Sequence, residues 1–251
     1  MLKIALHNSN PEIFYTIQGE GKNIGKPSIF IRLSLCNLYC FWCDTDYTWN
    51  WENTNFRHQN DSNQAYKKFK KSDHIIKMTN EEILKKLKKY PCENLVITGG
   101  EPLVQKKNLT SLLKYLKAHN DNYHIEFETN GTIIPDKELD TFADQYNVSV
   151  KLANSLVSEK ERIQPEAIRF FAQSPKSNFK FVLDTPQDFE ELEKIVKDFG
   201  IDAKKVYLMP QGINTQILQQ KQQYLVELCK AKGFNYTDRL HILIYGDKRG
   251  V

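Results

Sequence analysis

The sequence predicts an α/β fold in which helices cover a partial, open barrel of parallel strands. Short apolar stretches alternate with amphipathic helical stretches over most of the 251 residues, which is typical of sheets built from strand–helix units. Glycine-rich or polar motifs follow several of these strands, at the end where α/β barrels carry their active sites. Barrels of this length commonly form one domain, so we expect residues 1–251 to be a single domain.

Six apolar stretches are expected to form the barrel strands, in a (β/α)6 arrangement. The first follows Pro27 and is a nearly continuous apolar run, as expected of a parallel strand that is buried on both faces. The expected strands are Ser28–Leu35, Asn94–Ile97, His124–Glu128, Asn147–Lys151, Asn178–Leu183 and Val206–Pro210. Two earlier strands flank a turn-forming sequence and indicate an N-terminal hairpin: Lys3–Leu6 and Glu12–Ile17.

Capping sequences indicate where two of the helices begin. Thr79 and Glu82 form a capping box ahead of apolar residues at helical spacing, and Thr185 with Asp188 forms a second one. Other expected elements are helices near Asn108–His119 and Asn214–Lys232, and a final strand at Leu240–Tyr245. Residues 49–72 are polar and are interpreted as an insertion with a short lysine-rich helix, in which His58 lies at the surface.

Composition excludes several classes of function. The net charge of +4 is small and the lysines are spread over the chain, so nucleic-acid binding is not indicated. No stretch is apolar enough to span a membrane, and the first residues lack the features of a signal peptide. Three cysteines are clustered while Cys92 and Cys229 are isolated, which favours a reducing compartment over a disulfide framework. We therefore expect a cytoplasmic protein.

Cys36, Cys40 and Cys43 form the strongest candidate site in the sequence. Three thiolates at this spacing can hold three irons of a four-iron cluster, which leaves the fourth iron free to bind a reactant. A structural zinc site would need a fourth ligand, for which His58 is the nearest downstream candidate. Two disulfides among the five cysteines are possible on paper, but bonds between residues at such short spacings would be strained. The iron–sulfur cluster is the favoured interpretation.

Two other motifs indicate contact with a ligand. The turn Gln18-Gly19-Glu20-Gly21 combines glycines, which let the backbone approach a ligand closely, with side chains that can hydrogen-bond a heterocycle. A simple hairpin turn would use the same glycines. Arg32 interrupts an apolar strand, so it needs either an acidic partner or a substrate carboxylate that its planar fork can bind. We favour the carboxylate.

These motifs resemble those of the radical S-adenosylmethionine (SAM) enzymes. The C-x3-C-x2-C spacing, the aromatic Trp42 before the last cysteine and the Gly-Gly-Glu-Pro turn at 99–102 are similar to that superfamily. Gln18 to Gly21, Ile29 to Arg32 and Cys43-Asp44-Thr45 resemble the 7-carboxy-7-deazaguanine synthases within it. The resemblance spans nearly the whole chain and implies the partial TIM-like barrel of radical SAM proteins.

The resemblance implies a lyase that converts 6-carboxy-5,6,7,8-tetrahydropterin to 7-carboxy-7-deazaguanine with release of ammonia, in queuosine and deazapurine biosynthesis. The implied cofactors are a [4Fe-4S] cluster, SAM and Mg²⁺. A deoxyadenosyl radical made from SAM acts on the substrate, so no acid or base is assigned. One alternative is another radical SAM enzyme, such as an activase of glycyl-radical enzymes. Another is a structural or electron-transfer metal protein.

The resemblance also assigns roles to individual residues. The three cysteines hold the cluster and Thr45 holds the magnesium ion, although the hydroxyl of Thr45 could instead cap the loop. The implied SAM contacts are Trp42, Cys43, Asp44, Gly100, Glu101, Ser149, Val150, Lys151 and Gln211, with Val150 standing where the family has proline. The implied substrate contacts are Ile17, Gln18, Gly19, Glu20, Arg32, Thr98 and His241, the last being equally compatible with a core histidine. A homodimer and an electron donor such as flavodoxin or ferredoxin are also implied.

Overall fold

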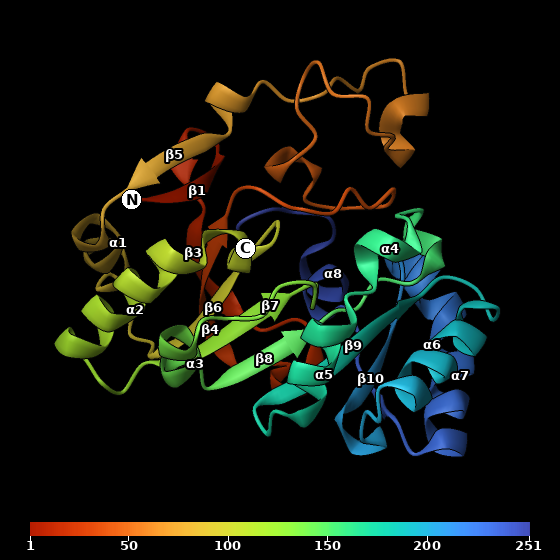
Figure 1. The fold of residues 1–251 in the computed structure, drawn as a ribbon. Helices are drawn as coiled ribbons and strands as arrows, with labels where there is room; N and C mark the ends of the chain where they lie inside the picture. Colours follow the sequence, from red (N-terminus) through yellow and green to blue (C-terminus); the bar gives the residue numbers. More distant parts are fainter.

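The computed structural model describes all 251 residues and contains one strongly curved sheet with helices along its outer side (Figure 1). Six central strands run parallel, in the predicted order. They are β4 (Pro27–Leu33), β6 (Asn94–Gly99), β7 (His124–Thr129), β8 (Gln145–Val148), β9 (Ser177–Leu183) and β10 (Val206–Pro210). The short β11 (Asn235–Tyr236) pairs with β10, and no ladder joins β10 to β4, so the barrel is open as predicted.

The N-terminal strands form an antiparallel extension of the sheet. β1 (Leu2–His7) pairs with β2 (Asn10–Pro11), β5 (Ile75–Met78) and β4, while β3 (Ile13–Ile17) pairs with β4. Asn8 and Ser9 connect β1 to β2 with φ angles of 48° and 61°, as a two-residue hairpin turn requires. An N-terminal hairpin is therefore present, but its second strand is β2. The expected second strand at 12–17 forms β3, which pairs with β4 instead and places residues 18–21 beside the barrel.

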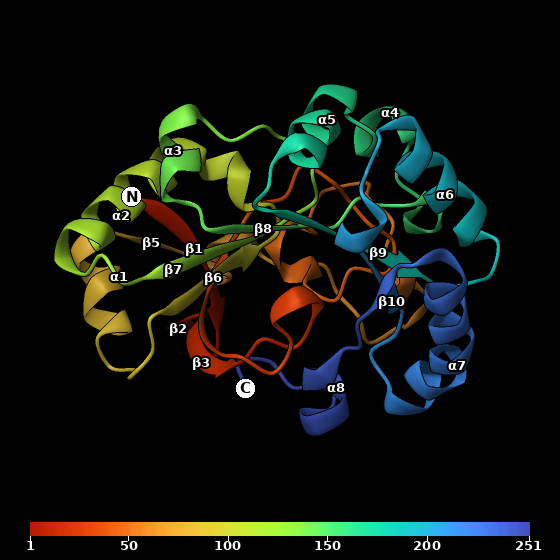
Figure 2. The same ribbon diagram turned by 90° about the horizontal axis from the view of Figure 1, so that it is seen from below.

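The helices lie mainly outside the sheet (Figure 2). Their bounds are α1 (Asn80–Leu87), α2 (Lys106–His119), α3 (Lys137–Phe142), α4 (Glu159–Arg162), α5 (Pro165–Gln173), α6 (Asp188–Asp198), α7 (Thr215–Lys232) and α8 (Leu240–Tyr245). The capping box of α1 forms as predicted, with Glu82 N donating to Thr79 Oγ1 and Thr79 N donating to Glu82 Oε2. None of these helices combines the length and apolar character that crossing a bilayer demands.

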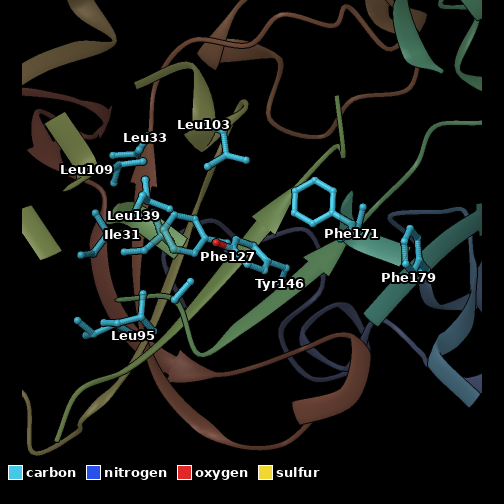
Figure 3. Close-up of a cluster of buried hydrophobic side chains, with 14 of the residues drawn as sticks. Ile31, Leu33, Leu95, Leu103, Leu109, Phe127, Leu139, Tyr146, Phe171 and Phe179 are labelled. Carbon is cyan, nitrogen blue, oxygen red and sulfur yellow. The ribbon is translucent and has the colours of Figure 1, made fainter. Parts of the chain in front are cut away.

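The apolar core lies between the outer face of the sheet and the helices. Ile31 and Leu33 of β4, Leu95 of β6, Phe127 of β7 and Leu109 of α2 are all fully buried there (Figure 3). Because successive side chains of a strand point to opposite faces, the residues between these apolar positions point into the barrel. Burial of the outer face thus directs the intervening polar side chains toward the interior.

Three sequence-based expectations are wrong. Leu240–Tyr245 is the helix α8, because a short apolar run without alternation does not distinguish a strand from a helix. Its first N–H donates to the carbonyl of Gly19 (2.9 Å), and Figure 2 shows α8 between β3 and α7. Residues 49–72 contain 3-10 turns instead of a lysine-rich helix, at Gln59–Ser62 and Lys71–Asp73. β8 ends at Val148, so residues 149–151 form the loop that follows it.

Candidate active site

A cavity of about 270 Å³ opens at the carboxyl ends of the barrel strands. Residues after β4, β6, β8 and β10 line it, because parallel strands deliver the loops that follow them to one edge of the sheet. Residues 17–20 also line it, at the end of β3, which runs antiparallel to β4. All of the predicted site residues line this cavity except Glu101 and Val150. The structure thus brings together motifs that lie up to about two hundred residues apart in the sequence.

The loop after β4 carries the three cysteines into the cavity. It leaves the strand through Leu35, whose φ of 79° is unusual for a large apolar residue. The N–H of Leu35 donates to the carbonyl of Thr48 (2.9 Å), and the N–H of Cys43 donates to the carbonyl of Cys40 (3.2 Å). Backbone hydrogen bonds within the loop therefore help to set the positions of the cysteines.

The cysteine sulfurs receive hydrogen bonds from the surrounding protein. Leu38 N donates to Cys36 Sγ (3.4 Å) and Trp49 Nε1 donates to Cys43 Sγ (3.3 Å). Burial raises the pKa of all three thiols, and that of Cys40 to about 12. Buried thiolates need a compensating positive charge, which a metal centre supplies, and hydrogen bonds to sulfur are among the factors that tune iron–sulfur clusters.

The cysteine arrangement fits a cluster better than a single metal ion. No three Cys, His, Asp or Glu side chains stand close enough to share one ion, as a structural zinc site requires. In a four-iron cluster each cysteine binds a different iron, so the sulfurs can be farther apart. The zinc alternative is also weakened by His58, whose Nε2 donates to the carbonyl of Cys43 (2.8 Å) and is not aimed at a metal.

His58 and its segment correct an expectation of the sequence analysis. His58 was expected at the surface, but it is 2% exposed and stacks on Tyr66 at a centroid distance of 5.6 Å. Tyr66 in turn donates to Asp46, which follows the cysteine motif. The polar composition of residues 49–72 concealed this aromatic packing. The segment therefore supports the cysteine loop.

The turn after β6 lies against the cysteine loop. Gly99 has a φ of 138°, and a Cβ there would lie 2.0 Å from the carbonyl oxygen of Leu33. At Gly100 a Cβ would lie 2.2 Å from the carbonyl oxygen of Leu35. Only glycine fits at either position, so the backbone of this turn can approach a ligand beside the cysteines, next to Thr98, which also lines the cavity.

Glu101 and Val150 are the two expected SAM contacts that do not line the cavity. Glu101 is fully buried: Oε1 accepts from Leu103 N (2.9 Å) and Thr129 Oγ1 (2.9 Å), and Oε2 accepts from Asn130 N (2.6 Å). Burial raises the pKa of Glu101 to about 6. Glu101 therefore joins the end of β6 to the end of β7. Val150 is 1% exposed and belongs to the apolar core.

The residues on either side of Val150 line the cavity. Lys151 Nζ donates to Ser149 Oγ (2.9 Å) and lies 5.6 Å from the ring centroid of Trp42. Trp42 Nε1 donates to the carbonyl of Asn154 (2.9 Å), which fixes the indole. Gln211, immediately after β10, lines the same cavity. These residues could hold a ligand that carries both an aromatic ring and negative charge.

A network of buried charges in the cavity was not identified from the sequence. Lys180 Nζ donates to Glu20 and to Glu128 Oε2 (3.0 Å), and Gln18 Nε2 donates to Glu128 Oε1 (3.2 Å). Arg239 Nε donates to Glu20 Oε1 (3.1 Å). Burial acts to raise the pKa of Glu20, but the two cations outweigh it and hold that pKa below its usual range. Burial raises the pKa of Glu128.

One member of this network left a signal in the sequence. Lys180 lies between two phenylalanines of β9, and a charge inside an apolar strand is the pattern that identified Arg32. Glu128 was seen only as part of a strand end. Arg239 lies in a loop without any periodic pattern, so the sequence contained no comparable signal for it.

Arg32 has the acidic partner that the sequence analysis left open. Its Nε donates to Glu12 Oε1 (3.0 Å), and Tyr47 Oη donates to both oxygens of the same carboxylate (3.0 Å each). The two terminal nitrogens of Arg32 have no hydrogen-bond partner in the protein, and the side chain lines the cavity. Glu12 thus orients the guanidinium and leaves its outer edge for an anion.

Thr45 and His241 both face the cavity. The hydroxyl of Thr45 lies 3.5 Å from Cys43 Sγ and makes no capping hydrogen bond to the turn that follows, so the capping alternative is not observed. His241 Nε2 lies 3.9 Å from Glu20 Oε1, and burial lowers its pKa. A Cβ at Gly19 would lie 2.0 Å from His241 Nδ1, which explains why glycine occupies that position.

Comparison with known proteins places the chain in a family. The model of the radical SAM superfamily matches residues 31–245. A 7-carboxy-7-deazaguanine synthase of Pyrobaculum aerophilum is 36% identical over 241 residues, which is 95% of each chain. The chain belongs to the 7-carboxy-7-deazaguanine synthase family of radical SAM proteins. A family member from Rhodopirellula baltica is 31% identical over 253 residues, covering 96% of this chain and 87% of its own.

A solved structure agrees with this family membership. The crystal structure of QueE from Escherichia coli aligns with a TM-score of 0.65 and 25% identity over 95% of both chains. The predicted radical SAM fold class is therefore confirmed, including the open sheet. As a radical SAM protein, the chain uses a [4Fe-4S] cluster and SAM, which fits the cysteine loop and the glycine turn described above.

Proposed function

We propose that the protein converts 6-carboxy-5,6,7,8-tetrahydropterin to 7-carboxy-7-deazaguanine with release of ammonia, as a step of queuosine or another 7-deazapurine pathway. The observation that carries the proposal is that the three cysteines, the turn at 18–20 and Arg32 line one cavity. Relatives that match almost the whole chain are named 7-carboxy-7-deazaguanine synthase. The proposed activity is therefore supported by the residues that share the cavity and by the family to which the chain belongs.

The cofactors would occupy the side of the cavity formed by the loops after β4, β6, β8 and β10. Cys36, Cys40 and Cys43 would hold the cluster. When bound, the cluster and SAM together supply the one-electron chemistry that starts the reaction. The proposed SAM contacts are Trp42, Cys43, Asp44, Gly100, Ser149, Lys151 and Gln211. Glu101 and Val150 would act only by holding their neighbours, since neither lines the cavity.

The charged residues of the cavity would orient the substrate. The outer edge of Arg32 would bind the carboxylate, because guanidinium matches a carboxylate with two parallel hydrogen bonds. The carboxyl oxygens of Glu20 and Glu128 would accept hydrogen bonds from the amino and ring N–H groups of the pterin, with Gln18, Thr98 and His241 nearby. Held in this way, the reacting atom would stay at one place beside SAM and away from water.

Thr45 is the proposed protein ligand of a magnesium ion. A single hydroxyl cannot hold Mg²⁺ alone, but the ion keeps several waters and shares oxygens with bound substrates. Thr45 fits this role because its hydroxyl makes no cap and lines the cavity next to Cys43. The substrate carboxylate would complete the coordination and would be oriented by it.

A small substrate is favoured over the polypeptide that a glycyl-radical activase would bind. The cavity volume of about 270 Å³ is near the lower end of the range for small-molecule sites, ~300–1,000 Å³. Asp247 to Val251 line the cavity in addition to the barrel loops, so chain segments surround it on several sides. An extended protein segment would need an open groove instead.

Other parts of the proposal rest on the family. We expect a homodimer, since two-fold symmetry is the commonest closed assembly, and an electron donor such as flavodoxin or ferredoxin. A cytoplasmic location and a single folding domain over residues 1–251 are further parts of the proposal. Light scattering of the reconstituted protein tests the dimer, and a monomer mass would refute it.

The decisive experiment is an anaerobic assay. Reconstituted protein is incubated with dithionite, SAM, Mg²⁺ and the carboxypterin, and mass spectrometry identifies the products. We expect 7-carboxy-7-deazaguanine from the wild type and from Cys229→Ala, and none from Cys40→Ala, which should also lose the brown chromophore. Reductive cleavage of SAM without any conversion of the pterin would refute the proposed substrate and keep the radical SAM assignment.

A further inference from the structure

Arg239 is a buried arginine whose guanidinium nitrogens all have partners within the site. It lies between β11 and α8 and is 8% exposed. Its Nε donates to Glu20 Oε1 (3.1 Å), its Nη1 donates to the carbonyl of Gly212 (2.7 Å), and its Nη2 donates to Asp44. One planar group thus holds three loops of the cavity together.

These three loops serve different ligands in the proposed function. Glu20 belongs to the substrate turn after β3, and Asp44 follows Cys43 in the cluster loop. Gly212 follows the proposed SAM contact Gln211 at the end of β10. Glu20 and Asp44 lie 219 and 195 positions from Arg239 in the sequence, so no local structure relates them. Arg239 is the physical link between the substrate turn and the SAM loops.

The two carboxylates depend on Arg239 to different degrees. Glu20 has a second cation, Lys180, and His241 lies 3.9 Å from it. The side chain of Asp44 has no hydrogen-bond donor other than Arg239. If a bound heterocycle draws Glu20 toward itself, the guanidinium must follow, and the position of Asp44 changes with it. Arg239 is therefore the side chain whose charge is shared between Glu20 in the substrate turn and Asp44 in the cluster loop.

We infer that Arg239 is a positioning residue that makes the binding of SAM and the binding of substrate interdependent. The inference rests on the proposed function, which assigns Glu20 to the substrate and Asp44 to SAM. Such coupling is reciprocal: each ligand changes the affinity for the other by the same factor. Lysine cannot replace this arginine, because the three acceptors lie at three different nitrogens of the planar guanidinium, whereas lysine offers all its donors from a single nitrogen.

The test measures binding without turnover. Anaerobically reconstituted protein with an oxidised cluster is titrated with SAM, with and without saturating 6-carboxy-5,6,7,8-tetrahydropterin, and each Kd is determined by calorimetry. We expect the pterin to tighten SAM binding in the wild type by about fivefold or more. In Arg239→Lys the change should fall below about twofold, while the cluster absorbance stays that of the wild type.

Arg162→Lys provides the matched control. Arg162 is also buried and binds the carbonyls of Val157 and Lys151 and the carboxylate of Glu191, but it does not join the two ligand sites. Its replacement should lower thermal stability and keep the coupling. Full coupling in Arg239→Lys, or no coupling in a wild type that binds the pterin, would overturn the inference.

A second arm uses SAM alone, so a failure of the proposed substrate can be told apart from a failure of the inference. Glu20→Gln should change the Kd for SAM by about twofold or more when Arg239 is present. The same substitution should change it by less than about 1.5-fold in Arg239→Lys protein. An equal effect of Glu20→Gln in both backgrounds would show that Arg239 does not couple the substrate turn to the binding of SAM.

Discussion

Replacement of Lys180 by methionine should destabilise the protein strongly, because Lys180 neutralises two buried carboxylates. Its side chain is 8% exposed, and those of Glu20 and Glu128 are each 16% exposed. Without Lys180, Glu20 keeps Arg239 as a cation, while Glu128 keeps only amide donors. Removal of one partner of a buried ion pair costs about 3–5 kcal/mol. For a chain of this size that lowers Tm by roughly 6–20 °C.

The loss of folding stability caused by Lys180→Met should become larger as pH rises. Burial raises the pKa of Glu128 even beside Lys180, and loss of the cation should raise it further. A carboxyl whose pKa is raised by folding is more protonated in the folded state, so its folding stability falls as pH rises through that pKa. The destabilisation by Lys180→Met should therefore be largest near pH 8 and smaller near pH 5.

Thermal unfolding of the reconstituted protein, followed by circular dichroism at several pH values, measures both effects. Lys176→Met is the control, because Lys176 Nζ lies 4.0 Å from the carboxylate of Asp140, donates to the backbone carbonyl of Asp140 (2.6 Å) and belongs to a side chain that is 32% exposed. Its replacement should cost less than about 1 kcal/mol. The double variant Lys180→Met/Glu128→Gln should recover part of the loss. If Lys180→Met behaved like Lys176→Met, or lost stability equally at all pH values, the argument from buried charge would be refuted.

Four further outcomes are expected. Gly99→Ala should lower the free energy of unfolding in urea by about 3 kcal/mol. Gly200 has a φ of 61°, but a Cβ there would meet no atom within 4 Å, so Gly200→Ala should lower it by only about 1–2 kcal/mol. Trp49→Phe removes a donor to a cluster sulfur and should lower the reduction potential by roughly 40 mV in a titration monitored by electron paramagnetic resonance. Thr45→Ala should keep SAM cleavage but lose product formation and its magnesium dependence, whereas Thr45→Ser should retain both. Arg32→Lys should weaken pterin binding by about 1.5–3 kcal/mol in calorimetry and change SAM binding much less.

Much of the fold and of the site could be predicted because the signals are local. The six barrel strands are short apolar runs bounded by turn residues, and all six are found where the alternation placed them to within a few residues. The spacing of Cys36, Cys40 and Cys43 is a property of one loop and needs no distant partner. Gly99 and Gly100 are required by backbone geometry that the sequence expresses as a glycine pair.

The errors occurred where distant contacts outweigh local patterns. The apolar run at 240–245 is helical because its start is held by the carbonyl of Gly19, more than two hundred residues away. His58 is buried because Tyr66 and the cysteine loop surround it, although its neighbours in sequence are polar. Glu101 points into the protein because Thr129 and Asn130 of the next strand end supply its hydrogen bonds.

The sequence by itself determined the strand order, the metal-binding loop and the edge of the sheet at which ligands meet, since each follows from periodicity or from spacing within a few residues. Only the tertiary structure decided how the charges of the cavity pair. Four separate segments supply the paired charges, Glu20, Glu128, Lys180 and Arg239. Nothing in the sequence around a charged residue indicates which distant residue will pair with it. Pairing is set by which side chains the curved sheet brings within hydrogen-bonding distance, and a charge buried there without a partner would cost several kcal/mol.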